Sequence, residues 1–118
     1  VLFDVGKYNL KKDARATLDS LAAKIRIIDK ATLVIEGHTD SDGSHDMNLI
    51  LSENRSNAVK KKLQEIFGDD AQYDYDVRWY GKTKPRVPND SDENKQLNRR
   101  VEVTVQPPQE YYQSLETH

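Results

Sequence analysis

The chain of 118 residues contains no cysteine, which excludes a disulfide framework, a thiolate metal site and a cysteine nucleophile. It has no apolar run near the roughly 20 residues that a helix needs to cross a bilayer. Its formal net charge of −2 provides no basic footprint for nucleic acid. A signal peptide is also lacking and the chain begins with valine, so we expect any membrane anchor to belong to a part of the parent protein outside this chain.

The residues that are present follow two hydrophobic periods, one typical of strands and one typical of helices. We predict strands at 1–5, 31–36, 73–80 and 101–105, and helices at 10–28, 46–67 and, as a short turn, 93–97. This β-α-β-α-β-(short α)-β order predicts an α+β domain with a mixed four-stranded sheet and two main helices packed on it. We place this single domain at residues 1–106 and expect residues 107–118 to be a mobile tail.

The most informative stretch joins the end of a predicted strand to the start of the next helix. Asp40 lies in the loop after the strand, and Arg55 shares a helix face with Val59, which belongs to the apolar stripe. Arg55 therefore points inward, where a guanidinium needs an acceptor. Asp40 and Arg55 either pair with each other or face a cleft together, and the residues favour neither arrangement. In a cleft, they would suit a ligand with an ammonium and a carboxylate on one carbon.

Other chemistries fit the residues less well. A calcium loop that starts at Asp40 fails, because the sixth and twelfth positions lack the required glycine and glutamate. His38, Asp40 and His45 lack a further zinc ligand at a firm spacing, and no serine can be paired with a base. The alternating aromatic residues from Tyr73 to Trp79 fit a core better than a sugar-stacking surface. We therefore predict no catalytic residue, no metal, no cofactor and no enzymatic activity.

Ordered motifs along nearly the whole chain resemble the OmpA-like domain, the peptidoglycan-binding module of OmpA-type porins, Pal lipoproteins and MotB-type motor proteins. The resemblance covers about Val1 to Val105. It is carried by Phe3-Asp4, Gly37 to Asp40 with Gly43, Asn48, Leu51-Ser52-x-x-Arg55, Val59, Gly81, Pro85, Asn89 and Asn98 to Val101. It implies a sheet covered by helices and a location in the bacterial periplasm, as the soluble domain of an outer-membrane or, less readily, an inner-membrane protein.

The resemblance also implies non-covalent binding of the peptidoglycan stem peptide through meso-diaminopimelate, which would anchor a membrane protein or lipoprotein to the cell wall. The family residues that grip this ligand fall on Asp40 and Arg55. The positions that match neighbouring pocket residues are Thr39, Asn48, Leu51, Asp4 and Arg100. The strand alternation does not decide whether Arg99 or Arg100 faces the pocket. The alternative is a protein-interaction or dimerisation domain whose pocket has drifted.

Overall fold

The computed structural model describes residues 1–68 and 72–108 and contains three helices and three strands in this part of the chain. The helices are α1 (Lys12–Ile25), α2 (His45–Phe67) and α3 (Asp92–Asn98). The strands are β1 (Lys30–Gly37), β2 (Gln72–Trp79) and β3 (Val101–Gln106). The order of the helices and of these strands agrees with the order that the hydrophobic periods predict.

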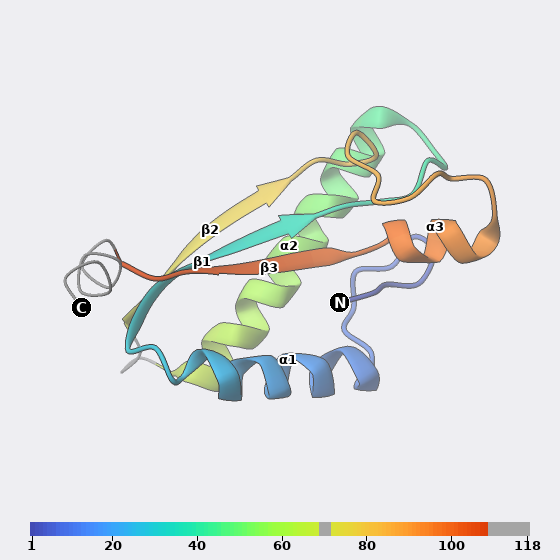
Figure 1. Ribbon diagram of the computed structural model, residues 1–118. Helices are drawn as coiled ribbons and strands as arrows, with labels where there is room; N and C mark the ends of the chain where they lie inside the picture. Colours follow the sequence, from blue (N-terminus) through green and yellow to red (C-terminus); the bar gives the residue numbers. More distant parts are fainter. Residues whose placement is uncertain (69–71, 109–118) are drawn as a thin grey trace.

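The sheet is mixed, and β1 is its central strand (Figure 1). β1 pairs with β2 in parallel, with Leu33 opposite Tyr75, and it pairs with β3 antiparallel, with Leu33 opposite Val105. The last two strands therefore lie on either side of β1 and do not pair with each other. The crossover from β1 to β2 runs through α2, as a parallel connection requires.

The prediction of a fourth strand at residues 1–5 is wrong in its extent. Only a single antiparallel bridge, from Leu2 to Arg100, joins this segment to the rest of the sheet. Val1 and Phe3 bond to the backbone of Val101 and Arg99, and the chain then turns away at a Gly6 with φ of 65°. Three residues beside β3 are too few to form a regular ladder, so the described sheet has three strands.

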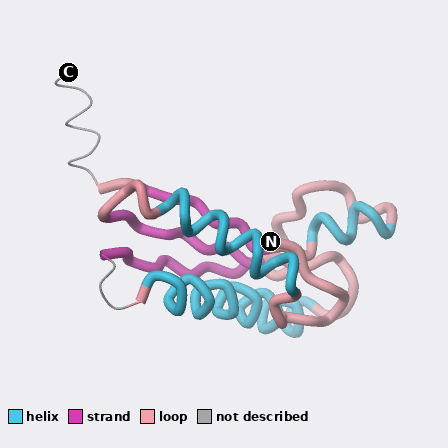
Figure 2. The backbone as a smooth tube through the Cα atoms, turned by 90° about the horizontal axis from the view of Figure 1, so that it is seen from below, coloured by secondary structure: helices cyan, strands magenta, loops and turns pink. Residues whose placement is uncertain are grey.

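One apolar core lies between the sheet and the two long helices (Figure 2). Its buried members are Phe3, Leu18, Ala22, Ile25, Ala31, Leu33, Ile35, Val59, Leu63 and Val101. Leu33 and Ile35 lie on the same face of β1. Residues of both α1 and α2 belong to the same core, so both helices cover that face. α3 lies apart from this layer, beyond the ends of the strands, as Figure 2 also shows.

The start of α2 is held against the end of β1 by residues without bulk. Ser44 caps the helix by accepting the Met47 backbone N–H at 3.2 Å. A Cβ atom at Gly37 would lie 2.2 Å from the backbone oxygen of Ser52, so only glycine permits this close approach. The close contact fixes the loop after β1 relative to α2, and this is the loop that carries Asp40.

The helix α2 ends where the sequence predicts, at a Gly68 with φ of 70°. Pro107 and Pro108 follow β3 and are the last described residues. The rest of the predicted tail, residues 109–118, lies outside the described part of the chain. The domain boundary at residue 106 and the mobility of the tail therefore stay predictions.

Candidate functional site

A cavity of about 410 Å³ opens at the end of β1, where the following loop meets the start of α2 and the N-terminal loop. Open sheets with helices commonly bind ligands at the carboxyl ends of their strands. Three charged residues that line it, Asp40, Arg55 and Arg99, are only 5%, 0% and 8% exposed. The full lining comprises Val5, Gly6, Tyr8, Thr39, Asp40, Asp42, Gly43, Met47, Asn48, Ile50, Leu51, Asn54, Arg55 and Arg99.

The carboxylate of Asp40 is held in place by two partners. Its Oδ1 accepts the backbone N–H of Asp42 at 3.0 Å, and its Oδ2 accepts Nη1 of Arg99 at 2.9 Å. The side chains of this ion pair are only 7% and 9% exposed, so water screens it little. A carboxylate has about four acceptor sites, so Asp40 retains capacity for a further donor from the cavity.

The guanidinium of Arg55 is anchored by three backbone carbonyl groups, two from the N-terminal loop and one from the loop after β1. It donates to Lys7 from Nε at 2.8 Å, to His38 from Nη1 at 3.0 Å and to Asp4 from Nη2 at 3.0 Å. Its carbon Cζ also lies 5.2 Å from the centre of the Phe3 ring. Since a guanidinium has five N–H donors, these three bonds leave two of them for the cavity.

Asp40 and Arg55 do not form the direct ion pair that the sequence left open. The ion-pair partner of Asp40 within the described residues is Arg99. Burial lowers the pKa of Arg55 to about 10, with the positive charge of Arg99 acting in the same direction and the negative charge of Asp40 opposing both. Arg55 therefore stays protonated at neutral pH, and the cavity floor carries two cations against one buried anion. Such a floor favours a ligand that brings a carboxylate as well as an ammonium.

Three more residues of the predicted site, Thr39, Asn48 and Leu51, line the same cavity. The side chain of Asn48 donates to the backbone oxygen of Asp42 at 2.8 Å, which fixes the loop around Asp40. The backbone N–H of Thr39 bonds to Gly81, a residue whose φ of 60° and close approach to α2 suit glycine. These contacts connect the loop around Asp40 to α2 and to the segment at Gly81.

The remaining two predicted residues do not line the cavity. The carboxylate of Asp4 pairs with Lys11 at 2.9 Å, and only the backbone oxygen of Asp4 contributes, through Arg55. Arg100 pairs with Glu102 at 2.8 Å and donates to the backbone of Lys84. The structure brings Arg99 into the cavity in place of Arg100.

A sequence signal for Arg99 was present. Side chains alternate along a strand, and Arg99 has the same parity as Val101, which belongs to the core face, whereas Arg100 has the parity of the exposed Glu102. An arginine in line with a core residue at the start of a strand points towards the same side as the helix that carries Arg55. The parity identifies Arg99 only once the structure shows that the cavity and the apolar core lie on the same side of the sheet.

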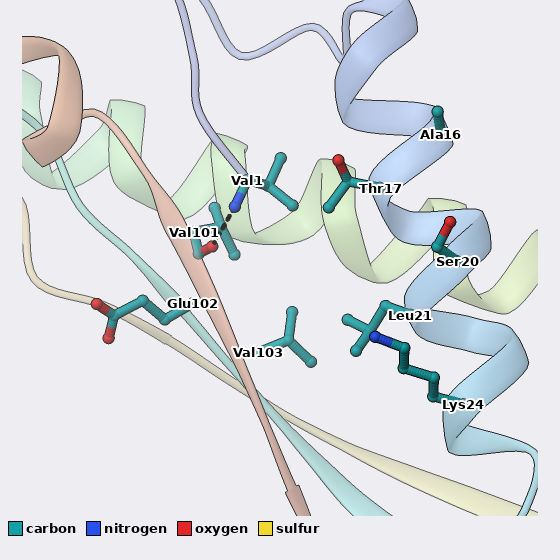
Figure 3. Close-up of a pocket in the computed structure, with 9 residues that line it drawn as sticks. All are labelled: Val1, Ala16, Thr17, Ser20, Leu21, Lys24, Val101, Glu102 and Val103. Atoms are coloured by element: carbon teal, nitrogen blue, oxygen red, sulfur yellow. Dashed lines mark hydrogen bonds between the residues drawn. The ribbon is translucent and has the colours of Figure 1, made fainter.

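A larger hollow of about 650 Å³ lies between α1 and β3 (Figure 3). Leu21 and Val103 face each other across it, while Glu102 points away from the helix. Its volume is larger than that of the cavity at Asp40, but no set of buried charged side chains converges in it. Polar groups that converge in a cavity give a ligand its orientation, so we regard the smaller cavity as the candidate site.

Within the described ranges, no group of three or more His, Asp or Glu side chains is placed to hold a metal ion. In the same ranges, no helix has the length and apolar character that crossing a membrane requires.

Comparisons with known proteins agree with the motifs of the chain. The protein-family model described as OmpA family matches residues 2–99 of this chain. Outer membrane protein A of Bordetella avium is 38% identical over 103 residues, which cover 87% of this chain and 52% of that protein. Outer membrane porin F of Pseudomonas aeruginosa is 35% identical over 106 residues, covering 90% of this chain and 30% of that protein. The crystal structure of the peptidoglycan-associated lipoprotein from Burkholderia pseudomallei aligns with a TM-score of 0.77 and 28% identity, over 90% of this chain and 88% of that one.

The chain thus spans about half or less of these two curated relatives, while it covers most of the lipoprotein structure. The structural match confirms the predicted α+β class, apart from the fourth strand. None of the three proteins is named as an enzyme.

Proposed function

Since the chain belongs to the OmpA family, as its motifs predict, we propose that it binds peptidoglycan non-covalently through meso-diaminopimelate and so anchors a membrane protein or lipoprotein to the cell wall. A structural relative is itself named a peptidoglycan-associated lipoprotein, and two sequence relatives are named as outer-membrane proteins. In this proposal the domain lies in the periplasm, and the part of the parent protein outside this chain provides the membrane attachment.

The observation that carries the proposal is the floor of the cavity, where Asp40, Arg55 and Arg99 converge. The side chain of diaminopimelate ends in a free ammonium and a free carboxylate on one carbon. Asp40 accepts the ammonium at its unused acceptor sites. Arg55 donates its two remaining N–H groups to the carboxylate, in the forked geometry that guanidinium groups favour.

The neighbouring residues orient this head group. Thr39 and Asn48 present polar groups beside Asp40, and Leu51 supplies an apolar wall for the methylene chain of the ligand. Arg99 holds the Asp40 carboxylate and adds positive charge next to the ligand carboxylate. Asp4 contributes through its backbone, and Arg100 lies outside the cavity, so neither side chain contacts the ligand in this proposal.

The test is calorimetric titration of the chain with a stem tripeptide that ends in meso-diaminopimelate, beside the same peptide with lysine in its place. Lysine keeps the ammonium but lacks the side-chain carboxylate, which leaves Arg55 unmatched. We expect the lysine peptide to bind more weakly by about 1–3 kcal/mol, the cost of an unsatisfied polar group. Equal affinity for the two peptides would overturn the proposed clamp.

A matched pair of variants separates the two candidate aspartates. Asp40→Asn keeps the shape of the side chain but removes the charge, and we expect binding to be lost. Asp4→Asn changes a carboxylate that pairs with Lys11 outside the cavity, and we expect unchanged binding. Unfolding curves of both variants show whether the fold persists. If the unaltered chain gives no heat with either peptide, the function moves to the alternative of a protein-interaction domain.

A further inference from the structure

Exposed apolar side chains gather at the mouth of the cavity that holds Asp40. Val5, Tyr8, Met47 and Ile50 are 66%, 52%, 71% and 59% exposed, and all four line this cavity. They make up half of the eight large apolar side chains that are exposed in the described part of the chain. We call these four residues the apolar rim. Single exposed apolar residues are ordinary, but a group of them around one opening marks a contact surface.

The apolar rim has two sides that come from different parts of the fold. Met47 and Ile50 lie three residues apart on α2 and therefore project from the same helix face. Val5 and Tyr8 come from the loop that precedes α1. Arg55 ties the two sides together, because it lies on α2 and donates to the backbone of Lys7 in that loop. The rim therefore stays in place around the charged floor.

The rim and the floor differ in chemistry, and this difference constrains the ligand. The floor residues are charged and almost fully buried, whereas the rim residues are mainly apolar and open to solvent. A small ammonium–carboxylate head group would fill the floor and leave the rim exposed. A ligand that uses both must carry hydrocarbon immediately outside its charged head group, where burying it is favourable.

Resting on the proposed function, we infer that the apolar rim makes the site selective for stem peptides that continue beyond diaminopimelate with alanine. One end of diaminopimelate belongs to the peptide chain and the other is the free head group. When the head group enters the floor, the peptide chain lies across the mouth. A following D-alanine places a methyl group and a neutral amide on the rim and moves the terminal carboxylate one residue further out, whereas a peptide that ends at diaminopimelate places that carboxylate directly on the rim. Apolar surface is a poor environment for that charge.

The experiment compares three ligands by calorimetry: free meso-diaminopimelate, the stem tripeptide that ends in it, and the tetrapeptide with one further D-alanine. We expect the tetrapeptide to bind about three- to tenfold more tightly than the tripeptide, since burying one methyl group corresponds to a factor of this order. The double variant Met47→Gln with Ile50→Gln replaces the rim on α2 with polar residues of good helix propensity. This variant should lose the tetrapeptide advantage and keep its affinity for free diaminopimelate.

The matched control is Ile27→Gln, which alters an apolar residue that is 84% exposed and lies outside the cavity. It should bind all three ligands as the unaltered chain does. Equal tripeptide and tetrapeptide affinities in the unaltered chain, with binding retained, would overturn the rim inference and leave the proposed function standing. A double variant that lowers the affinity for all three ligands equally would also overturn the rim inference. The substitutions would then have changed the charged floor and not the contact with the peptide chain. No binding of any ligand would end both proposals.

Discussion

The two halves of α2 bury side chains of opposite character against the same sheet. The buried residues of the first half are Asn48, Ser52, Arg55 and Ser56, and those of the second half are Val59 and Leu63. In the second half, stability comes from removing hydrocarbon from water, which depends on volume and little on direction. In the first half, it comes from hydrogen bonds to loops, which depend on direction. The polar half therefore fixes the geometry of the cavity, and the apolar half holds the layers together.

The largest loss of stability is expected when Arg55, in the polar half of α2, is replaced. Arg55→Ala removes the donor to three backbone carbonyl groups, so we expect the free energy of unfolding to fall by about 3–5 kcal/mol. Chemical denaturation followed by circular dichroism measures this loss. Arg55→Lys should recover little of it, because an ammonium on a flexible stem cannot replace a planar fork. Recovery of most of the stability by lysine would show that charge, and not geometry, is what this half needs.

The apolar half of α2 should tolerate a conservative substitution that the polar half does not. Leu63 is fully buried, and Leu63→Ala leaves a cavity that should lower the free energy of unfolding by about 2–5 kcal/mol. Leu63→Met keeps the volume and should cost less than about 1.5 kcal/mol. The same denaturation measurement applies. If Leu63→Met cost as much as Leu63→Ala, the two halves would be equally dependent on shape and the comparison would fail.

A pH-dependent loss of stability should arise at the polar end of the sheet. Burial, with the nearby charge of Arg100, lowers the pKa of His38 from 6.5 to about 4. The unfolded chain therefore binds a proton at a pH where the folded chain does not, so stability is full above pH 6.5 and falls as the pH drops towards 4. The shift corresponds to at most about 3 kcal/mol. Urea unfolding at a series of pH values between 7 and 4 measures it.

A variant of His38 tests the assignment. Both ring nitrogens of His38 are buried without a hydrogen-bond partner among the described residues, and the ring lies against Tyr80 with 5.3 Å between ring centres. His38→Phe should therefore keep or raise the stability at pH 7 and flatten the curve between pH 6.5 and 4. His45→Phe changes an exposed residue and should leave the slope as it is. A slope that survives His38→Phe would assign the proton uptake to other groups.

The smallest effect concerns a single hydrogen bond of the polar half. The hydroxyl of Ser52 accepts the backbone N–H of Gly81 at 2.9 Å in a buried position. Ser52→Ala should cost about 1–2 kcal/mol, because that N–H loses its partner. Ser20→Ala, on the exposed side of α1, should change stability by less than about 0.5 kcal/mol. A Ser52→Ala variant as stable as the Ser20→Ala control would mean that the polar half is less dependent on its bonds than the comparison states.

The elements with a strong hydrophobic period could be predicted from sequence. The apolar stripe of α1 places Leu18, Ala22 and Ile25 in the core, and the end of α2 at Gly68 follows from local chemistry. The extent of the predicted strand at residues 1–5 could not be determined from its hydrophobic period. Its apolar pattern is typical of a strand, but its pairing depends on how far it runs beside β3 before the turn at Gly6.

The candidate site was predicted in part. The loop that carries Asp40 and the helix face that carries Arg55 follow from the order of the elements, and the structure places both residues in one cavity. The partner of Asp40 could not be chosen from local pattern, because Arg99 lies 59 residues away in the chain. The sequence also could not show that Asp4 reaches Arg55 through its backbone oxygen while its carboxylate pairs with Lys11.

The sequence by itself determined the local features of this protein: the period of each helix and strand, the end of α2 at Gly68, and the motifs of the OmpA family. These depend on neighbouring residues, whose interactions need no long loops to close. Only the tertiary structure decided that Asp40 pairs with Arg99, that Arg55 binds three backbone carbonyl groups, and that the apolar rim surrounds them. Those contacts join distant segments, and their geometry is set by how the layers pack.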